Sequence, residues 1–531
     1  MSSSLPPRPP GRRVLRAALF GGLAAGACSP IIDVTIPEDY VAGSPDAGPG
    51  DAGAAECVAA VDCGSAERFE CVDGACVDLE TVDPCADPGR RVLVSRFIRA
   101  DQEWTPDRCY LLAEPTFVVS ATLRIRRGTR ILGASADSAL ISTRTGRIEA
   151  RGSARYPVVF TSANPPGSRL PSDWGGVALL GDAPLNVPGG VDLLEGVDPP
   201  EGESGALIEY GGQSPDDNCG FLRYVRIEFA GFARGEGDEL NGLTLAGCGS
   251  ATGIDFVQVH FGSDDGVEVF GGTVGMSRVV ISRAQDDSLD WDQGWTGWAQ
   301  YLVILQDGPR TEVAAVFEGG DNGFEADSLG DDAIGDPRSR PRLYNVTMIG
   351  SQAPGARSRA MLFKEGTSVE MRNLVVARYA RGLWDIEDPI TAECFDPGRR
   401  GRGACTGTTA FAQDGMALSD LGSMGSLVEM DDDGRDGGFD ELGLVNTLIA
   451  EGTAFVVDTS TTAHLVQPFL ELVGPGTPLD LRPRAGSPLL GRATSYPSPP
   501  DGVVGGEDFL GALPGVGETD WTKPWTAFPE D

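Results

Sequence analysis

The chain has 531 residues, of which 41% are hydrophobic and 23% charged, so most of it should fold around a substantial core. Its formal net charge of −36 at pH 7 repels a polyanion and excludes nucleic acid as a favourable partner. Cations and neutral or basic ligands fit this charge, although acidity can also serve only to keep an exported protein soluble.

The first segment, residues 1–27, has the organisation of a signal peptide. An arginine-rich start precedes an apolar stretch, residues 17–27, that is too short to span a bilayer as a permanent helix. The stretch ends in Leu-Ala-Ala-Gly-Ala-Cys, which resembles a bacterial lipobox and implies that Cys28 is lipidated. Ala25 stands where the lipobox favours leucine, and the alternative is an ordinary secretory signal with Cys28 as a bystander. We therefore expect an exported, lipid-anchored protein at the outer membrane or cell surface.

A flexible tether is expected next. Residues 28–56, which start at the lipidated Cys28, are rich in proline, glycine, alanine and aspartate and bury too little apolar surface to fold. No later apolar run approaches the ~20 residues needed to span a membrane. The lipid on Cys28 is therefore the expected contact with a membrane.

Ten cysteines remain after Cys28, an even number in a chain expected to reach an oxidising compartment. Four of them lie within residues 57–84 and predict a small disulfide-stapled module, similar to the EGF-like cysteine-rich segments of exported lipoproteins. Zinc is the alternative, but this segment has no histidine and no Cys-x-x-Cys pair. The module contains Cys57, Cys63, Cys71 and Cys76, and the other six form the local pairs Cys85 with Cys109, Cys219 with Cys248, and Cys394 with Cys405.

Short β-branched runs broken by glycine and aspartate make up most of the remaining sequence. Runs that begin at Phe256, Arg278 and Tyr301 are 22 and 23 residues apart, and another begins 44 residues later at Asn345, about two such periods. One coil of a parallel β-helix, with three short strands and turns, fills ~22 residues. A β-sandwich or a propeller is the alternative, but their units recur every ~8–12 or ~40–50 residues.

Alternate residues within these runs should point inwards and stack into a continuous core. The residues expected on the inward side are Val225, Ile227, Phe229, Val257, Val259, Phe261, Val279, Ile281, Leu302 and Ile304.

Several motifs carry a resemblance to a known family. They include GTRILG and IEARGSARYPVVFTS within residues 128–162, DWGGVALLGDAPLN at 173–186, SDDGVEVFGGTV at 263–274 and DLRPRAGSPLLG at 480–491. Together they resemble right-handed parallel β-helix lipoproteins of the pectate-lyase-like type. The resemblance implies an all-β fold, with a β-helix and C-terminal cap over residues 85–531, and exposure at the cell surface.

An acidic stretch is the sharpest chemical feature of the sequence. Between positions 255 and 332 there are sixteen Asp and Glu residues, three Arg and no Lys. Two doublets, Asp264-Asp265 and Asp286-Asp287, occupy the same place in consecutive coils, so stacking should bring them ~4.8 Å apart. Like charges at that distance repel by ~3–4 kcal/mol at an effective dielectric of ~20, so a shared cation would stabilise them.

Calcium suits clustered carboxylate oxygens in turns, and a solvated acidic face is the alternative. The remaining residues expected to complete a calcium site are Glu268, Asp290 and Asp292, with Asp321, Glu325 and Asp327 as further candidates.

Three tryptophans, Trp291, Trp295 and Trp298, lie beside these acidic residues. Aromatic faces next to carboxylates commonly hold sugars, which predicts a polysaccharide or a cell-surface glycan as the partner. The alternative is that the three rings pack inside a turn.

Paired carboxylates also admit an enzyme, either a polysaccharide lyase or a glycoside hydrolase, in the same acidic groove. Few residues of the sequence favour an enzyme. His260 and His464 are the only histidines, and no Gly-His-Gly element is present. Arg283 is the one candidate base near the doublets. A structural spacer without a specific ligand is the third alternative. The preferred prediction is a glycan-binding or adhesion solenoid with bound calcium and no assigned catalytic residue.

Overall fold

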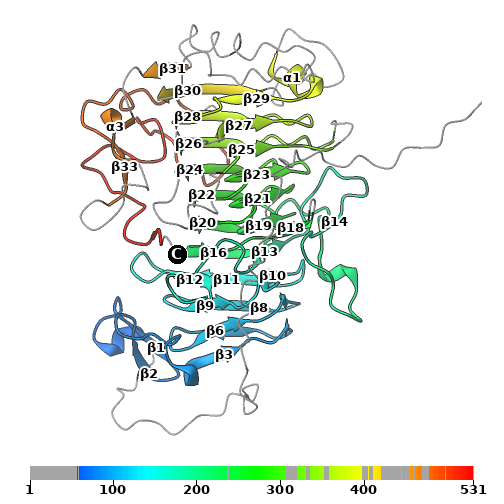
Figure 1. Cartoon of the computed structure of the whole chain (residues 1–531), viewed down its shortest axis with the longest axis vertical. Helices are drawn as coiled ribbons and strands as arrows, with labels where there is room; N and C mark the ends of the chain where they lie inside the picture. The colour runs from blue at the N-terminus through cyan, green and yellow to red at the C-terminus, as the bar shows by residue number, and fades with distance from the viewer. Residues whose placement is uncertain are drawn as a thin grey trace, which may run out of the picture.

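The computed structural model shows an elongated solenoid whose strands run across its long axis (Figure 1). The predicted signal peptide, Cys28 and the predicted tether lie outside the described residues. No helix in the described part is long and apolar enough to cross a membrane. The structure describes residues 57, 59–235, 238–306, 320–330, 335–351, 358–396, 405, 411–419, 444, 454–457, 461–468, 478–496 and 498–529.

A ten-stranded parallel sheet takes one short strand from each successive coil. In chain order its strands are β4 (Phe97–Ile98), β7 (Thr116–Val118), β10 (Ala139–Ser142), β13 (Gly176–Leu180), β19 (Leu243–Ala246), β21 (Val267–Phe270), β23 (Leu289–Asp292), β25 (Asn322–Ala326), β27 (Arg359–Phe363) and β29 (Trp384–Ile386).

A fifteen-stranded parallel sheet supplies the other two sides of each coil. Its early coils use separate strands, and most of its later coils join the two segments into one long strand. The early strands are β3 (Arg91–Leu93), β5 (Gln102–Trp104), β6 (Cys109–Leu112), β8 (Thr122–Arg126), β9 (Arg130–Gly133), β11 (Arg147–Arg151) and β12 (Val158–Ser162). The later strands are β16 (Gly220–Glu228), β20 (Gly253–His260), β22 (Gly275–Ser282), β24 (Trp298–Leu305), β26 (Arg342–Ile349), β28 (Glu370–Ala377), β30 (Ala412–Ser419) and β31 (Ala454–Val457). The joined strands run from β16 to β30, while the last strand, β31, pairs only with the second segment of β30.

These two sheets confirm the all-β parallel solenoid predicted from the sequence. The described part also contains short elements outside the two sheets. They are β1 (Phe69–Val72), β2 (Ala75–Asp78), β14 (Asp192–Leu193), β15 (Glu209–Tyr210), β17 (Phe232–Gly235), β18 (Asp238–Leu240), β32 (Leu465–Gln467), β33 (Asp480–Pro483), the helices α1 (Pro389–Phe395) and α3 (Thr461–His464), and the 3-10 turns η1 (Ala60–Cys63), η2 (Pro88–Arg90) and η3 (Gly205–Leu207).

Each long strand bends at one residue with positive φ, and this bend gives the coil its third side. Strand pairing skips the bend residue, so that Asp255 pairs with Ser277 before it and Val257 with Val279 after it. Left-handed backbone is costly for a residue with a side chain, so the surrounding stacked coils must hold it. The bend residues with φ between 52° and 62° are Tyr224, Phe256, Arg278, Tyr301, Asn345 and Asn373, and β30 bends at Gly415 with φ of 70°.

The inward residues of successive coils form one continuous core. In one coil Val279 and Ile281 of β22 are buried together with Leu289 of β23, and burying such a side chain fully is worth ~1.5–3 kcal/mol. The predicted inward valines, leucine and isoleucines all belong to this core. Phe229 and Phe261 are also buried, but they lie at a second bend, with φ of 59° and 56°, and stack on each other outside the main core.

The 44-residue interval between Tyr301 and Asn345 is one coil, so the prediction of about two periods was wrong. β24 pairs directly with β26, with Trp298 opposite Arg342. A residue count alone cannot distinguish an additional coil from a segment inserted within one coil.

Five disulfides join cysteines of the described chain, and each of the three local pairs expected from the sequence is bridged. The four cysteines of the N-terminal module pair with each other, so the zinc alternative fails there. The bridges are Cys57–Cys71, Cys63–Cys76, Cys85–Cys109, Cys219–Cys248 and Cys394–Cys405.

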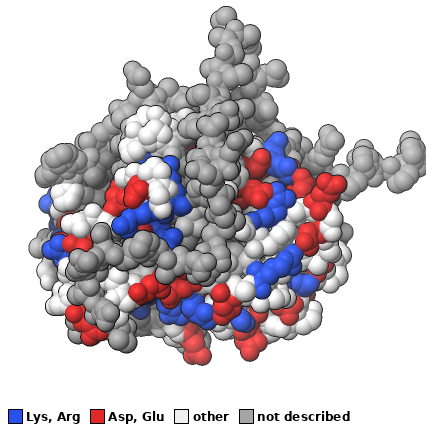
Figure 2. Space-filling model, turned by 90° about the horizontal axis from the view of Figure 1, so that it is seen from below, with Lys and Arg blue, Asp and Glu red and all other residues white. Residues whose placement is uncertain are grey.

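The cysteine-rich module packs against the first coils of the solenoid. Its β1–β2 hairpin brings Glu70 into ion pairs with Arg126 and Arg127. Seen from below, towards this end of the solenoid, acidic and basic side chains are intermingled on the surface (Figure 2). These charges are therefore largely matched with each other rather than gathered into one patch of a single sign.

The chain between β13 and β16 covers the outer face of the ten-stranded sheet in its early coils. Ile141 and Leu180 of the sheet pack with Leu194 and Tyr210 of this segment in an apolar cluster. In the following coils the outward positions of the same sheet change from apolar to acidic, and the candidate site lies there.

The C-terminal segment returns along the flank of the fifteen-stranded sheet, and the chain ends beside the middle coils (Figure 1). Carboxamide side chains from separate coils hold its backbone. Gln258 both donates to and accepts from the main chain of Ala527, at 2.6 and 2.9 Å. Gln300 does the same with Val504, at 2.7 and 2.8 Å. In each contact one carboxamide bonds both the N–H and the carbonyl of a single residue. These paired hydrogen bonds hold the C-terminal segment against the solenoid.

Candidate functional site

The second residue of each acidic doublet belongs to a ladder of side chains that runs from coil to coil. Asn241 Oδ1 accepts a hydrogen bond from the backbone N–H of Asp265 at 3.2 Å. Asp265 Oδ1 accepts from the N–H of Asp287 at 2.9 Å, and Asp287 Oδ1 accepts from the N–H of Asn322 at 2.6 Å. The ladder satisfies backbone donors that the turn before the ten-stranded sheet would otherwise leave buried and unpaired.

The first residues of the doublets, Asp264 and Asp286, lie one above the other as the sequence predicts. The N–H of Asp286 faces the carbonyl oxygen of Asp264 at 3.4 Å. Carboxylate oxygens of Asp264, Asp265 and Asp286 all lie within 4.8 Å of one another. We call these three residues the doublet end of the acidic cluster.

The acidic cluster continues along the outer face of the ten-stranded sheet. The pairing of β21, β23 and β25 places Glu268 beside Asp290 and Asp290 beside Glu325. Carboxylate oxygens of Asp265, Glu268 and Asp290 form a second group within 4.8 Å, so Asp265 is shared with the doublet end. Asn241 also donates from its side-chain amide to Glu268.

A lysine closes the other end of the cluster. Asp290, Glu325 and Asp327 again have oxygens within 4.8 Å of one another. Lys364 Nζ lies 2.5 Å from Glu325 and 3.5 Å from Asp327. We call these four residues the lysine end. The sequence prediction missed Lys364, although it is one of only two lysines in the chain and its rarity was a usable signal.

Burial and mutual repulsion shape the titration of the cluster. Burial, followed by neighbouring carboxylates, raises the pKa of Asp264, Asp265 and Asp287 well above the usual aspartate range. Burial and the charge of Glu325 raise the pKa of Asp286 to about 7. The charge of Lys364 lowers the pKa of Asp286 without outweighing burial and the neighbouring carboxylates. The carboxylates of the doublet end are therefore only partly offset by positive charge, and they need protons or a cation.

The lysine end differs from the doublet end because it contains a positively charged residue, Lys364. Burial lowers the pKa of Lys364, but the charges of Asp327 and Glu325 outweigh it and the net pKa is raised, so the ammonium group stays charged. Burial still raises the pKa of Asp327 in spite of Lys364. One lysine therefore neutralises only part of this end.

The described donors fit a hard divalent cation. Calcium takes ~6–8 oxygen ligands at ~2.3–2.6 Å, so ligand atoms around one ion lie within about 5 Å of one another. The doublet end and the group of Asp265, Glu268 and Asp290 both meet this spacing. Asp265 uses Oδ1 in the ladder, which leaves Oδ2 for a cation.

Several other sequence predictions do not hold in the structure. Trp291 and Trp295 are fully buried in the core, so they cannot present a face to a sugar. Trp298 is partly exposed on β24, in the fifteen-stranded sheet and not in the sheet that carries the acidic residues, so only its own role in binding a ligand stays a prediction. Arg283 is also fully buried, with its guanidinium over the ring of Phe261, so it is not a base within reach of a substrate.

Two of the acidic residues proposed for the calcium site have other contacts. Asp292 is buried and its carboxylate accepts from the backbone N–H of Gln293 at 2.5 Å. Asp321 is half exposed and pairs with Arg381 at 3.3 Å. Neither residue belongs to the groups of close carboxylates described above.

Comparison with known proteins agrees with this architecture. The family model described as a pectate-lyase like beta helix domain matches residues 97–399, which is more than half of the chain. The chain therefore belongs to this family of β-helix domains, and the matched region includes the whole acidic cluster and Lys364. No curated protein and no solved structure matches the chain. The family is consistent with a carbohydrate-related solenoid and specifies no ligand.

Proposed function

We propose that this protein is an exported, lipid-anchored β-helix that binds extracellular glycans and holds calcium in its acidic cluster. The observation that carries the proposal is the doublet end, where Asp264, Asp265 and Asp286 bring carboxylate oxygens within 4.8 Å of one another at adjacent coils. The fold of the family supports the carbohydrate part, because a solenoid of this type offers long lateral surfaces to an extended polymer.

Calcium at this place would act mainly on stability and rigidity. Two carboxylates ~4.8 Å apart repel each other more strongly as they are desolvated, and an ion between them converts that repulsion into attraction. The doublets belong to consecutive coils, so one ion would join two turns of the solenoid. The ion is expected at the doublet end and towards Glu268 and Asp290, because Lys364 already supplies positive charge at the other end.

The proposed location of the protein in the cell is based on its N-terminal sequence. The lipobox-like ending at Cys28 and the tether of residues 28–56 support a lipid anchor at the outer membrane or cell surface. Five disulfides in the described chain agree with an oxidising compartment. In such a place the accessible polymers are glycans, and the net charge of −36 disfavours nucleic acid.

The experiment is a melting curve of the full chain in calcium and in EDTA, with magnesium as a second cation. We expect calcium to raise the melting temperature and the double variant Asp264→Asn/Asp286→Asn to abolish the rise. Asp216→Asn removes an exposed aspartate outside the cluster and is the matched control. A calcium shift that survives the double variant would place the ion elsewhere, and no shift in any variant would remove the metal from the proposal.

The glycan part is tested with the same samples on an array of polysaccharides in calcium. Binding without release of reducing or unsaturated sugars supports a binding protein. Release of such sugars, lost in the double variant, would instead make the acidic cluster the centre of a hydrolase or lyase.

A further inference from the structure

The register of two neighbouring strands holds Lys364 beside Asp327. β25 pairs with β27 as far as Ala326, which lies opposite Phe363. The backbone N–H of Lys364 then donates to the carbonyl of Ala326 at 2.9 Å. Asp327 and Lys364 are the first residues after their strands, so the stacking of two consecutive coils brings a carboxyl group and a primary amine together.

Asp327 is buried without hydrogen bonds to its side chain. The residue is fully buried, and neither of its carboxylate oxygens has a hydrogen-bond partner among the described residues. Lys364 Nζ lies 3.5 Å from Oδ2. Buried polar groups in proteins are nearly always hydrogen-bonded, so a carboxyl group that lacks such bonds and faces an amine requires an explanation.

Glu325 lies where it can take a proton from the amine. Its Oε1 is 2.5 Å from Lys364 Nζ, and its Oε2 accepts from the side-chain amide of Asn322 at 3.5 Å. The side chains of Lys364 and Glu325 are only 20% and 17% exposed, so little water competes for their contact. A carboxylate within hydrogen-bond distance of an amine can serve as its general base.

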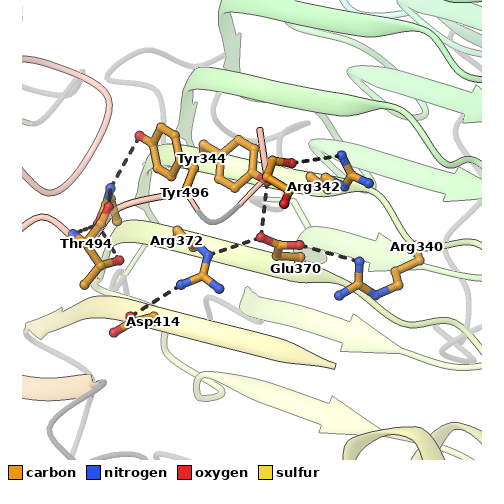
Figure 3. A network of polar contacts seen from close by, with 10 residues as sticks. Arg340, Arg342, Tyr344, Glu370, Arg372, Asp414, Thr494 and Tyr496 are labelled. Carbon is orange, nitrogen blue, oxygen red and sulfur yellow. Dashed lines mark hydrogen bonds and ion pairs between the residues drawn. The ribbon is translucent and has the colours of Figure 1, made fainter. Parts of the chain in front are cut away.

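A charged network on the fifteen-stranded sheet shows a different arrangement (Figure 3). Tyr344 and Arg372 donate to Oε1 of Glu370 at 3.2 and 3.1 Å. Arg340 lies 3.6 Å from Oε2, so both oxygens of Glu370 have partners. The cations there are guanidinium groups, which do not lose their protons in proteins and cannot act as nucleophiles. The lysine end differs because Asp327 lacks hydrogen bonds and the cation is an amine.

We propose that Lys364 and Asp327 form an amide bond between their side chains, an isopeptide bond that joins two consecutive coils. Nζ passes a proton to Glu325 and attacks Cγ of Asp327. A C–N bond forms and one C–O bond breaks. The oxygen leaves as water with the two protons that the ammonium group gives up, so Glu325 returns to its starting state. The reaction needs no oxidant, cofactor or other reactant.

The structure favours this reaction in two ways. Holding the amine and the carboxyl group in contact replaces an encounter between separate molecules, which lowers the barrier. Burial also favours a neutral amide over a desolvated ion pair, because charged groups lose more on leaving water. The cross-link goes beyond the proposed function, since it requires neither calcium nor a glycan. Like the disulfides it would restrict the unfolded chain, but reducing agents would not break it.

The test is peptide mapping of the full chain after reduction of its disulfides. Trypsin cuts after lysine and arginine, so an unmodified chain yields residues 311–338 and residues 360–364 as separate peptides. The proposed bond blocks cleavage at Lys364. It should yield residues 311–338 joined to residues 360–372, with their summed mass less one water, and fragmentation should place the link on Asp327. Separate peptides, or a link through another carboxyl group, would overturn the proposal.

Three variants test the role of each group. Lys364→Arg keeps the positive charge but removes the nucleophile, so the joined peptide should disappear. Glu325→Gln cannot take the proton, so the joined peptide should form ~100-fold or more slowly in pulse-labelled protein. Lys523→Arg is the matched control, because it removes the other lysine, which pairs with Asp520 at 2.8 Å, and it should change nothing.

Two results with these variants would contradict the assignment. A joined peptide that persists in Lys364→Arg would show that the link uses another residue. Formation at the wild-type rate in Glu325→Gln would overturn the role given to Glu325 in moving the proton. The mapping of the wild-type chain needs no variant, so the proposal stays testable even if a substitution prevents folding.

Discussion

Oδ1 of Asp265 accepts a hydrogen bond from the backbone N–H of Asp287, 2.9 Å away in the next coil. This bond shows that the two residues of each doublet have different tasks. Asp265 and Asp287 support the turn through the ladder, whereas Asp264 and Asp286 add charge beside it. In an acidic repeat of a solenoid, one residue can therefore support the backbone while the residue next to it is available to bind a ligand.

The ladder predicts opposite effects for two substitutions of Asp265. In EDTA, Asp265→Ala should lower the free energy of unfolding by ~1–3 kcal/mol, because a buried backbone donor loses its acceptor. Asp265→Asn keeps the Oδ1 acceptor and removes a buried charge, so it should match or exceed the stability of the wild type. Urea denaturation of both variants measures the difference, and equal losses would show that the charge and not the hydrogen bond matters.

Lys364 should be critical for stability even without any ligand. Lys364→Met leaves buried carboxylates at the lysine end without their cation, which should cost ~3–5 kcal/mol in denaturant unfolding. The only other lysine, Lys523, is 39% exposed and pairs with the single carboxylate of Asp520, so Lys523→Met should cost less than Lys364→Met. Similar losses for the two variants would contradict the role given to Lys364.

The buried His260 predicts a pH dependence at the C-terminal segment. Its Nδ1 faces Ser282 and its Nε2 faces the carbonyl of Pro529, both at 2.8 Å. Burial, with repulsion from Arg283, lowers its pKa from 6.5 to about 3. The folded state thus needs neutral imidazole while the unfolded chain protonates below about pH 6.5, so this stability is complete at neutral pH and declines as the pH falls towards 3.

The measurement is the unfolding free energy at pH 7 and pH 5 for the wild type and for His260→Gln. The histidine should contribute a loss of ~1.4 kcal/mol for each pH unit below about 6.5. The wild type should therefore lose more stability than the variant over this interval. Parallel losses would mean that the imidazole is not held neutral by the C-terminal segment.

Regular spacing explains what the sequence could predict. Runs 22 and 23 residues apart were sufficient to stack Asp264 under Asp286, because parallel strands in register carry equivalent residues into contact. The disulfide pairs Cys219–Cys248 and Cys394–Cys405 followed from proximity in the sequence. The sequence predicted less well whether a side chain points into the core or outwards at the residues where a strand bends.

The missed features all depend on orientation or on inserted segments. Trp291 shares the parity of Leu289 and points into the core, although the acidic residues on either side of it suggested a surface. Arg283 sits at a bend with φ of 58°, which turns its side chain into a buried contact. Lys364 joins the cluster across an interval that does not follow the period, so spacing alone could not place it there.

Calorimetric titration of calcium into the metal-free full chain tests the central claim most directly. The claim is that Asp264 and Asp286, stacked in consecutive coils, bind one ion between them. We expect saturable binding that disappears in Asp264→Asn/Asp286→Asn and persists in Asp216→Asn. Binding of equal strength in all three proteins, or no heat with the wild type, would contradict the claim.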